Sequence, residues 1–271
     1  MKTLYVLGAA MMTIAALPAA AQDTAPPPPI TVSGSVALVS DYRFRGVSQS
    51  DKEMAIQGGI TVAHESGFYA GVWGSNLAGW GTFGGSNMEL DLIGGFKHSF
   101  GGATVDVGLT WYMYPGGADL TDFAEPYVKV SGTAGPVNLL AGIAYAPKQK
   151  ALGNFSNTPQ SLGQSEDNFY IWGDASAGIP STPITVKAHL GYSDGNPGLG
   201  PNGTSVAPTG KYMDWLLGVD YVLGPVTLGA AYVDTDISTA ESAYLQPNFS
   251  STKDGSSIAG SRLVVSVTAA F

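Results

Sequence analysis

The sequence predicts an all-β fold, a twelve-stranded antiparallel transmembrane β-barrel, and three observations support this prediction. The last eleven residues, 261–271, alternate in polarity and end on the aromatic residue Phe271. Charged residues are only 12% of the chain, against about a quarter in a typical soluble domain, yet no apolar run beyond residue 21 is long enough for a membrane-spanning helix. Short and long connections alternate along the chain. Outer-membrane barrels combine these features, because short periplasmic turns face longer extracellular loops.

The first 30 residues are expected to lie outside this barrel. Residues 1–21 have the pattern of a cleavable signal peptide, with the charge of Lys2, an apolar run over residues 4–17 and Ala19-Ala20-Ala21 as the cleavage site. Residues 22–30 include four consecutive prolines and are predicted to form a periplasmic spacer, because proline is excluded from strand interiors. The barrel domain is therefore predicted to cover residues 31–271.

Twelve segments alternate apolar and polar residues with the period of a β-strand. They span residues 31–45, 53–64, 68–75, 88–100, 103–114, 123–131, 137–146, 168–179, 184–192, 212–223, 226–233 and 261–271. The short links between them lie at residues 64–67, 99–102, 132–136, 180–183 and 224–225. The long loops lie near residues 46–52, 76–87, 115–122, 147–167, 193–211 and 234–260. An even number of strands is expected to place both termini in the periplasm.

Aromatic residues gather toward the ends of these segments, as in the two interfacial girdles of a membrane barrel. Those toward the long loops are Tyr42, Phe44, Trp111, Tyr145, Trp172, Tyr192, Trp215 and Tyr232. Those toward the short turns are Phe68, Phe100 and Phe271. In the first segment, the period of two places Tyr42 and Phe44 on the lipid face.

Charged residues gather on the opposite face, because Lys or Arg facing lipid at the membrane midplane costs about 2–4 kcal/mol. The residues predicted to line a pore are Asp41, Arg43, Arg45, Glu53, Glu89, Asp91, Lys97, Asp106, Asp214, Asp220 and Arg262. The same face carries Glu125, Lys129, Asp174 and Lys187. These charges are expected to brace the wall as ion pairs, to line a path for small solutes, or to do both. Acids outnumber bases among them, which predicts a mild preference for cations.

Asp41, Arg43 and Arg45 form the densest charge cluster, near the predicted extracellular mouth. Two interpretations stay open for the two guanidinium groups. They could form a positive constriction for anions, or they could pair with Glu53 on the neighbouring strand.

Other functional classes are not favoured by the composition. The net charge of −9 argues against a nucleic-acid partner, since phosphate binding needs clustered Lys and Arg. The absence of cysteine excludes disulfides and thiolate metal sites. His64 and His98 lie at short-turn ends, on the predicted periplasmic side and far from outer-leaflet lipid. His189 has no evident Ser and acid partners on adjacent strands for nucleophilic catalysis. We therefore predict no enzyme activity, no metal and no other cofactor.

Four stretches of the sequence together resemble a known family. They are Ser40-Asp-Tyr-Arg-Phe-Arg-Gly-Val-Ser-Gln-Ser-Asp51, Ala55-Ile-Gln-Gly-Gly59, Gly67-Phe-Tyr-Ala-Gly-Val-Trp-Gly-Ser-Asn76 and Glu89-Leu-Asp-Leu92. These stretches are similar to the TorF family, whose members are regarded as porins of Gram-negative bacteria. The match is specific over residues 31 to about 115 and looser to Phe271. The resemblance implies an outer-membrane barrel with a pore, and it carries over no site residues.

The function predicted from the sequence is that of a porin-like channel in the bacterial outer membrane, for passive passage of small hydrophilic solutes or ions. The alternative is a non-conducting surface barrel whose extracellular loops bind a ligand or partner. The expected partners are outer-membrane lipid and lipopolysaccharide, and the barrel-assembly machinery, which would recognise the strand ending at Phe271.

Overall fold

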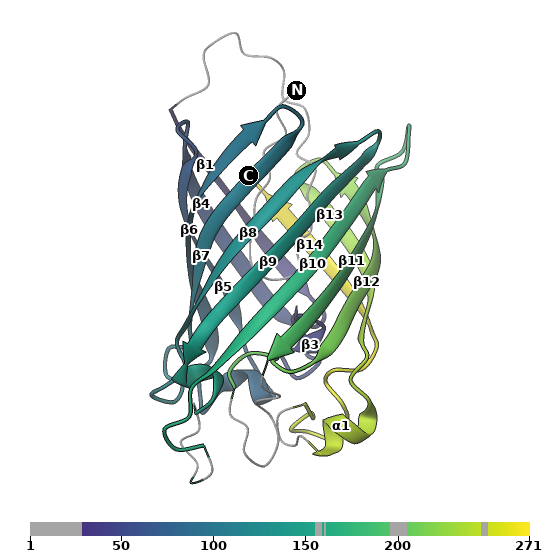
Figure 1. Ribbon diagram of the computed structural model, residues 1–271. Coiled ribbons are helices and arrows are strands. Elements are labelled where there is room, and N and C mark those ends of the chain that lie inside the picture. The colour runs from purple at the N-terminus through teal and green to yellow at the C-terminus, as the bar shows by residue number, and fades with distance from the viewer. Residues whose placement is uncertain (1–28, 155–158, 160, 196–204, 245–248) are drawn as a thin grey trace.

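The structure is a computed structural model that describes residues 29–154, 159, 161–195, 205–244 and 249–271. Twelve strands close into one antiparallel barrel in which each strand pairs with its neighbours along the chain (Figure 1). The barrel strands are β1 (Ile30–Val39), β4 (Ala55–His64), β5 (Phe68–Asn76), β6 (Met88–Phe100), β7 (Ala103–Met113), β8 (Phe123–Ala134), β9 (Val137–Gln149), β10 (Glu166–Gly178), β11 (Ile184–Gly195), β12 (Tyr212–Leu223), β13 (Val226–Thr235) and β14 (Arg262–Ala270). The predicted signal peptide lies outside the described residues, as does most of the predicted spacer.

The barrel closes where its first and last strands meet. β1 pairs with β14 over five register positions. Next to these positions, Gly34 and Phe271 exchange two backbone hydrogen bonds of 2.9 and 3.0 Å. A Cβ atom on Gly34 would lie 2.5 Å from Cζ of Phe271, so the aromatic ring lies directly over the glycine. Phe271 therefore both extends the pairing of the closing seam and covers a glycine within it.

Side chains alternate between the outer surface and the lumen, as the period of a strand requires. On β14, Leu263 and Val265 are 64% and 50% exposed, whereas Val264 between them is 6% exposed. The other strands repeat this alternation, and most of the large exposed apolar side chains lie on the outer face. Among the described residues, no helix has the length and apolar character needed to cross a membrane.

The predicted twelve-stranded antiparallel barrel is confirmed. β6 and β12 begin and end at the predicted residues, while β9 and β11 each run three residues further toward the long loops. The agreement is close because alternation and turn residues are local signals, and both are strong in this chain.

The end of the first predicted segment is wrong. β1 stops at Val39, and the chain then turns into the lumen, where β2 (Arg43–Phe44) pairs with β3 (Val47–Ser48) as a separate hairpin. Arg45 and Gly46 connect these strands with positive φ angles of 48° and 79°, the conformation of a tight two-residue hairpin turn. Tyr42 and Phe44, predicted to face lipid, are therefore buried inside the barrel, 1% and 6% exposed. The alternation continues past Val39 through Tyr42 and Phe44 and so does not reveal the break.

The predicted girdle position of Trp172 is also wrong. On β10, Tyr170 is buried and Ile171 is exposed, so the even-numbered positions face the lumen. Trp172 has this lumen parity and packs against the buried cluster that contains Tyr127 and Tyr170.

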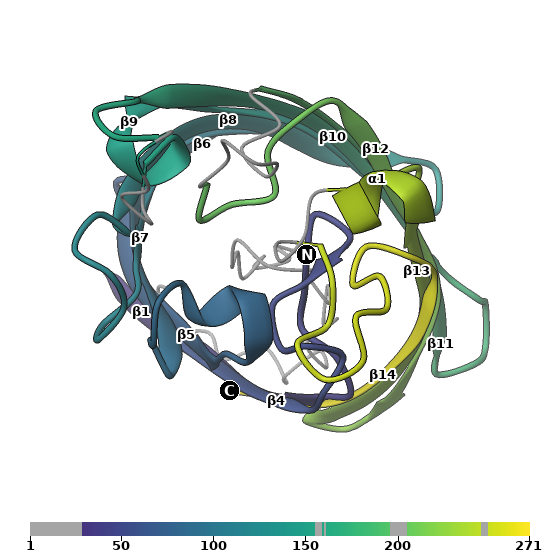
Figure 2. The ribbon, with the colours of Figure 1, turned by 90° about the horizontal axis from the view of Figure 1, so that it is seen from below.

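Several long loops fold inward over the lumen (Figure 2). Their short helical turns are η1 (Gly79–Thr82), η2 (Lys150–Leu152) and α1 (Thr239–Tyr244). Apolar side chains of the loops form a shared core, in which the ring of Trp80 lies 5.1 Å from that of Phe83 and 5.9 Å from that of Phe249. The long-loop end of the lumen is thus filled by loops that pack against one another.

Candidate functional site

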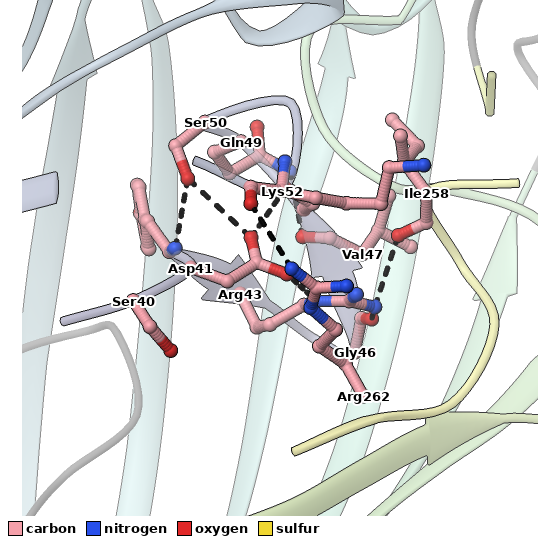
Figure 3. Close-up of polar contacts among 12 residues, drawn as sticks. Ser40, Asp41, Arg43, Gly46, Val47, Gln49, Ser50, Lys52, Ile258 and Arg262 are labelled. Carbon is pink, nitrogen blue, oxygen red and sulfur yellow. Dashed lines mark hydrogen bonds and ion pairs between the residues drawn. The ribbon is translucent and has the colours of Figure 1, made fainter. Parts of the chain in front are cut away.

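Two loops next to the closing seam fill much of the long-loop end, and we call them the plug: residues 41–53 and residues 249–260. Asp41 organises the first loop (Figure 3). Its Oδ2 atom accepts a 2.7 Å hydrogen bond from Nε of Arg43, and its Oδ1 atom accepts one of 2.5 Å from Oγ of Ser48. The backbone N–H of Tyr42 donates to Oγ of Ser50 at 2.9 Å. These buried contacts within the loop fix its shape.

Arg43 joins the first loop of the plug to the second. Its Nη1 atom donates to the carbonyl oxygens of Gly46, Ile258 and Gly260 at 2.8–3.0 Å. The backbone N–H of Ser48 also donates to the carbonyl of Ile258, at 3.0 Å. Because Arg43 is 1% exposed and its charge is paired within the plug, it acts as a structural tie between the two loops.

Side chains on the outer surface of the plug add further links between the loops. Oγ1 of Thr252 donates to Asp51 at 2.6 Å, and Nζ of Lys253 contacts Glu53 at 2.5 Å. Glu53 therefore pairs with the second loop, and the predicted pairing of Glu53 with the arginines of the first segment is wrong. That prediction assumed that a continuous first strand lies beside Glu53, whereas the chain leaves the barrel wall after Val39.

Arg45 reaches from the tip of the β2–β3 hairpin to strands on the other side of the barrel. Its Nη2 atom donates to both carboxylate oxygens of Glu125 on β8, each at 2.7 Å. Its guanidinium carbon lies 4.1 Å from the ring centroid of Tyr170 on β10. Its backbone carbonyl accepts a 3.0 Å hydrogen bond from Tyr212 at the start of β12. These contacts hold the tip of the hairpin across the lumen.

Two acids of β6 lie beneath the plug. The hydroxyl of Tyr42 donates to both carboxylate oxygens of Glu89, at 3.1 and 3.0 Å. Asp91 is 0% exposed, and neither of its carboxylate oxygens has a hydrogen-bond partner in the described residues. Both acids belong to the excess on which the predicted cation preference rests, yet they are covered by the plug. The cation preference stays a prediction, and fewer solvent-accessible acids now support it.

Three charged residues stand side by side on β6, β7 and β8, in the half of the lumen nearer the short turns. The strand register places Lys97 opposite Asp106, and Asp106 opposite Lys129. The two lysine Nζ atoms lie 3.9 and 3.7 Å from the same atom, Oδ2 of Asp106. The other oxygen of this carboxylate accepts a 2.7 Å hydrogen bond from the hydroxyl of Tyr69. One carboxylate therefore faces two ammonium groups.

His189 on β11 lies between two carboxylates. Its Nδ1 atom is 2.6 Å from Asp174 on β10, and its Nε2 atom is 3.2 Å from Asp214 on β12. The expectation that this histidine lacks acid partners is therefore wrong, because register brings one from each adjacent strand. Its two carboxylate contacts connect β11 to both adjacent strands, β10 and β12. No serine hydroxyl is among its hydrogen-bond partners in the described part of the chain. Within the same residues, no group of three or more His, Cys, Asp and Glu is placed to hold a metal ion.

The wall on the side of the closing seam has a different composition. Its strands are β13, β14, β1 and β4, which are consecutive in the barrel. Their lumen-facing residues include Thr227, Gly229, Ala231, Val233, Thr235, Arg262, Val264, Ser266, Thr268, Ala270, Ser33, Ser35, Ala37, Val39, Ala55, Gln57, Gly59, Thr61 and Ala63. The charged exception, Arg262, lies at the long-loop end, where it donates to the carbonyl of Lys52 at 3.4 Å. We call β13, β14, β1 and β4 the small wall, and β6–β12, which carry the other lumen-facing charges of the strands, the charged wall.

A cavity of about 220 Å³ lies between the plug and these two walls. From the plug and the charged wall, its lining includes Arg45, Glu125, Lys129, Tyr170, His189 and Asp214. From the small wall, its lining includes Ala37, Gln57, Gly229, Ala231, Ser266 and Thr268. The cavity thus has fixed charges and aromatic rings on one side and short side chains on the other.

The structure divides the predicted pore-lining residues into three groups. Four line the cavity: Asp41, Arg43, Arg45 and Asp214. Five lie on the lumen face of the charged wall outside this cavity: Glu89, Asp91, Lys97, Asp106 and Asp220. Two lie at the long-loop rim, Glu53 and Arg262. The structure therefore brings together only part of the predicted set.

Several lining residues escaped the sequence prediction. Tyr170 and Trp172 share the parity of Asp174 on one strand, so the alternation could have placed both rings in the lumen. Ala37 and Gly229 gave no usable signal, because a small side chain is compatible with either face of a barrel strand.

The family of the chain follows from a comparison with family models. The model described as "Bacterial protein of unknown function (Gcw_chp)" matches residues 23–271. The chain belongs to the Gcw_chp family. No curated protein matches this Gcw_chp sequence.

Solved porin structures share the fold of this Gcw_chp protein. The structure titled "NanC porin structure in rhombohedral crystal form" superposes with a TM-score of 0.56 and 11% identity, covering 89% of this chain and 99% of that one. The "KdgM porin" superposes with a TM-score of 0.53 and 8% identity, covering 88% and 99%. At such low identities the likeness concerns the fold alone, which is a porin-like closed barrel.

Proposed function

We propose that this protein is a narrow outer-membrane channel for passive passage of small hydrophilic solutes or ions. The proposal includes export by the predicted signal peptide, contact of the apolar outer face with outer-membrane lipid and lipopolysaccharide, and recognition of the last strand by the barrel-assembly machinery. Membership of the TorF family, suggested by the sequence resemblance, also belongs to the proposal. The absence of enzyme activity stays a prediction.

The observation that carries the proposal is the unequal lining of the lumen. A barrel whose only task is structural could fill its interior with side chains, as eight-stranded barrels do. Here the small wall leaves space beside Ala37, Gly229 and Ser266, and the cavity lies there. The charged wall opposite offers polar groups that can replace water around a passing solute. We infer that solutes move along the small wall.

The plug determines how wide this path is. Its two loops are joined by Arg43 and bound to the charged wall by Arg45, so they narrow the long-loop end. We therefore expect a much smaller unitary conductance than that of a barrel of sixteen or eighteen strands.

The alternative is a non-conducting barrel that binds a ligand or partner at the cell surface, and the packed loops are where such binding would occur. Their shared apolar core and the ties between residues 41–53 and 249–260 give that end a defined surface. Silent planar bilayers, together with binding that is lost when the loops are exchanged, would support this alternative over the channel.

The proposal is tested with a pair of tryptophan substitutions on neighbouring residues. Ala37 lines the cavity, whereas Leu38 is 45% exposed on the outer face. Ala37→Trp should fill space beside the small wall and lower the single-channel conductance in planar bilayers by at least about half. Leu38→Trp adds the same ring on the lipid side and should leave the conductance unchanged. Equal conductance of both variants and wild type, or no conductance at all, would contradict the proposed path.

A further inference from the structure

We infer that Lys97 and Lys129, with Asp106 between them, form a binding site for a small monovalent anion in the lumen. The inference rests on the proposed function for its biological role, since a solute in the channel would reach this site from the cavity. Lys129 lines that cavity. Lys97 lies on the far side of Asp106 from Lys129, nearer the short turns.

The charge around the site is not balanced one to one. Three other cations of the plug and lumen each have a carboxylate within hydrogen-bonding distance. These pairs are Arg43 with Asp41, Arg45 with Glu125, and Lys187 with Asp220, each at 2.7 Å. Lys97 and Lys129 instead share the single carboxylate of Asp106. Asp174, the other acid that acts on Lys129, is engaged by His189 at 2.6 Å. Among the described residues, the two ammonium groups therefore have only one carboxylate in direct contact, and this excess of positive charge favours an anion.

The two ammonium groups lack hydrogen-bond acceptors among the described residues. The separations of 3.9 and 3.7 Å from Asp106 are longer than an N–H···O hydrogen bond. In the described part of the chain, neither Nζ atom makes a hydrogen bond to an oxygen or nitrogen acceptor. The side chain of Lys129 is only 10% exposed, and that of Lys97 is 27% exposed. A lysine presents three N–H donors, so a small anion could accept hydrogen bonds from both residues at once.

Two tyrosine rings surround the lysines and are held in place by their contacts. Tyr69 and Tyr127 extend toward each other over Gly95 and Gly108, where a Cβ would collide with their rings, and their hydroxyls are hydrogen-bonded to each other. The Nζ atom of Lys97 lies 4.6 Å from the ring of Tyr69, and that of Lys129 lies 3.8 Å from the ring of Tyr127.

These rings position both ammonium groups next to the fixed carboxylate. The single excess charge and the close spacing of the lysines fit a halide or a small carboxylate such as formate. They do not fit a multivalent anion, whose remaining charges would stay uncompensated beside Asp106.

The test uses iodide, which is both a monovalent anion and a quencher of tryptophan fluorescence. The register links Lys129 through Gly142 to Trp172, so an ion at this site lies near a lumen tryptophan. In the refolded full-length barrel we expect quenching with a saturable component. Trp172→Phe should remove that component, which identifies the tryptophan that reports on the site.

Lys129→Gln should weaken the apparent iodide affinity by about tenfold or more, as expected for the loss of a charged hydrogen-bond donor. Lys187→Gln is the matched control, because it removes the same charge from a residue that has its own carboxylate, and it should change the affinity much less. Asp106→Asn keeps both ammonium groups and removes their shared partner, so it should tighten iodide binding. Equal affinities of Lys129→Gln and Lys187→Gln, weaker binding by Asp106→Asn, or quenching without saturation in wild type would overturn the site.

Bilayer recordings of the same variants separate the failure of the site from the failure of the channel. Silent bilayers combined with saturable iodide binding that Lys129→Gln weakens would support the anion site and contradict the channel. Conducting bilayers combined with iodide binding that Lys129→Gln leaves unchanged would support the channel and overturn the site.

Discussion

The small wall and the charged wall consist of the same kind of alternating strand, but their lumen-facing side chains differ in size and charge. The small wall contains the closing seam, and both loops of the plug leave or enter the barrel there, between β1 and β4 and before β14. Short side chains on this wall leave room both for the plug and for the cavity below it. The charged wall supplies Glu89 and Glu125 as partners for plug residues. One side of the sheet thus provides space, and the other side provides the contacts that anchor the plug.

The largest effect is expected from breaking the seam of the small wall. Deletion of Phe271 removes its two backbone hydrogen bonds with Gly34 and uncovers that glycine, so the barrel should close poorly. We expect a strong loss of heat-modifiable barrel from the outer-membrane fraction. Phe100→Ala on the charged wall is the control, since Phe100 is similarly exposed but lies outside the seam, and it should be tolerated. A normal level of folded protein after the deletion would contradict the role assigned to Phe271.

A smaller effect is expected where the plug meets the charged wall. Arg45→Gln leaves Glu125 buried without its counterion, which should lower the free energy of unfolding by about 3–5 kcal/mol. The double variant Arg45→Gln/Glu125→Gln should recover part of this loss, because no buried charge is then unpaired. Denaturant unfolding of the three proteins measures both quantities. If the double variant were no more stable than the single one, the ion pair would not be the anchor of the plug.

The smallest effect is expected at the outer surface of the plug. A hydrogen bond from the hydroxyl of Ser256 lowers the pKa of Asp254 from 3.8 to about 2, and the backbone N–H of Ser256 acts in the same direction. A lowered pKa in the folded state stabilises the loop above pH 3.8, and this contribution is lost as the pH falls toward 2. Protease cleavage within residues 249–260 should therefore increase over that pH window.

Asp254→Asn supplies the control for this acid effect. It should already be cleaved more readily at neutral pH and should respond less to acid, provided that an acid-active protease is used throughout. A cleavage rate with the same pH dependence in both proteins would show that other groups open the loop.

The barrel could be predicted from the sequence because its signals are local. Val264 and Val265 reveal their opposite faces through their immediate neighbours, and Gly224 and Pro225 mark a turn within a few residues. The plug could not be predicted in this way. The residues up to Arg45 keep the alternation of a strand past the end of β1. Their place inside the lumen depends on distant contacts, such as that of Arg45 with Glu125, eighty residues away.

The candidate site could be predicted in part, again from local signals in the sequence. Parity identified Lys97, Asp106 and Lys129 as lumen residues on successive strands, since each strand is strongly periodic. Their sharing of one carboxylate depends on the register between three strands, which a one-residue shift would abolish. Register is set by turn geometry and by packing across the whole barrel, so it cannot be read directly from a single sequence.

The tie between Arg43 and the carbonyl of Ile258 has a consequence for the order of folding. These residues are 215 positions apart in the chain, and they face each other only after β1 has met β14. Contacts with such long sequence separation carry a high entropic cost of loop closure and form late. A chain with an open seam would expose the buried arginine without its carbonyl acceptors, whereas a chain with a closed seam satisfies them. We therefore expect the plug to become ordered only after β1 and β14 have paired, so an ordered plug indicates a fully closed barrel.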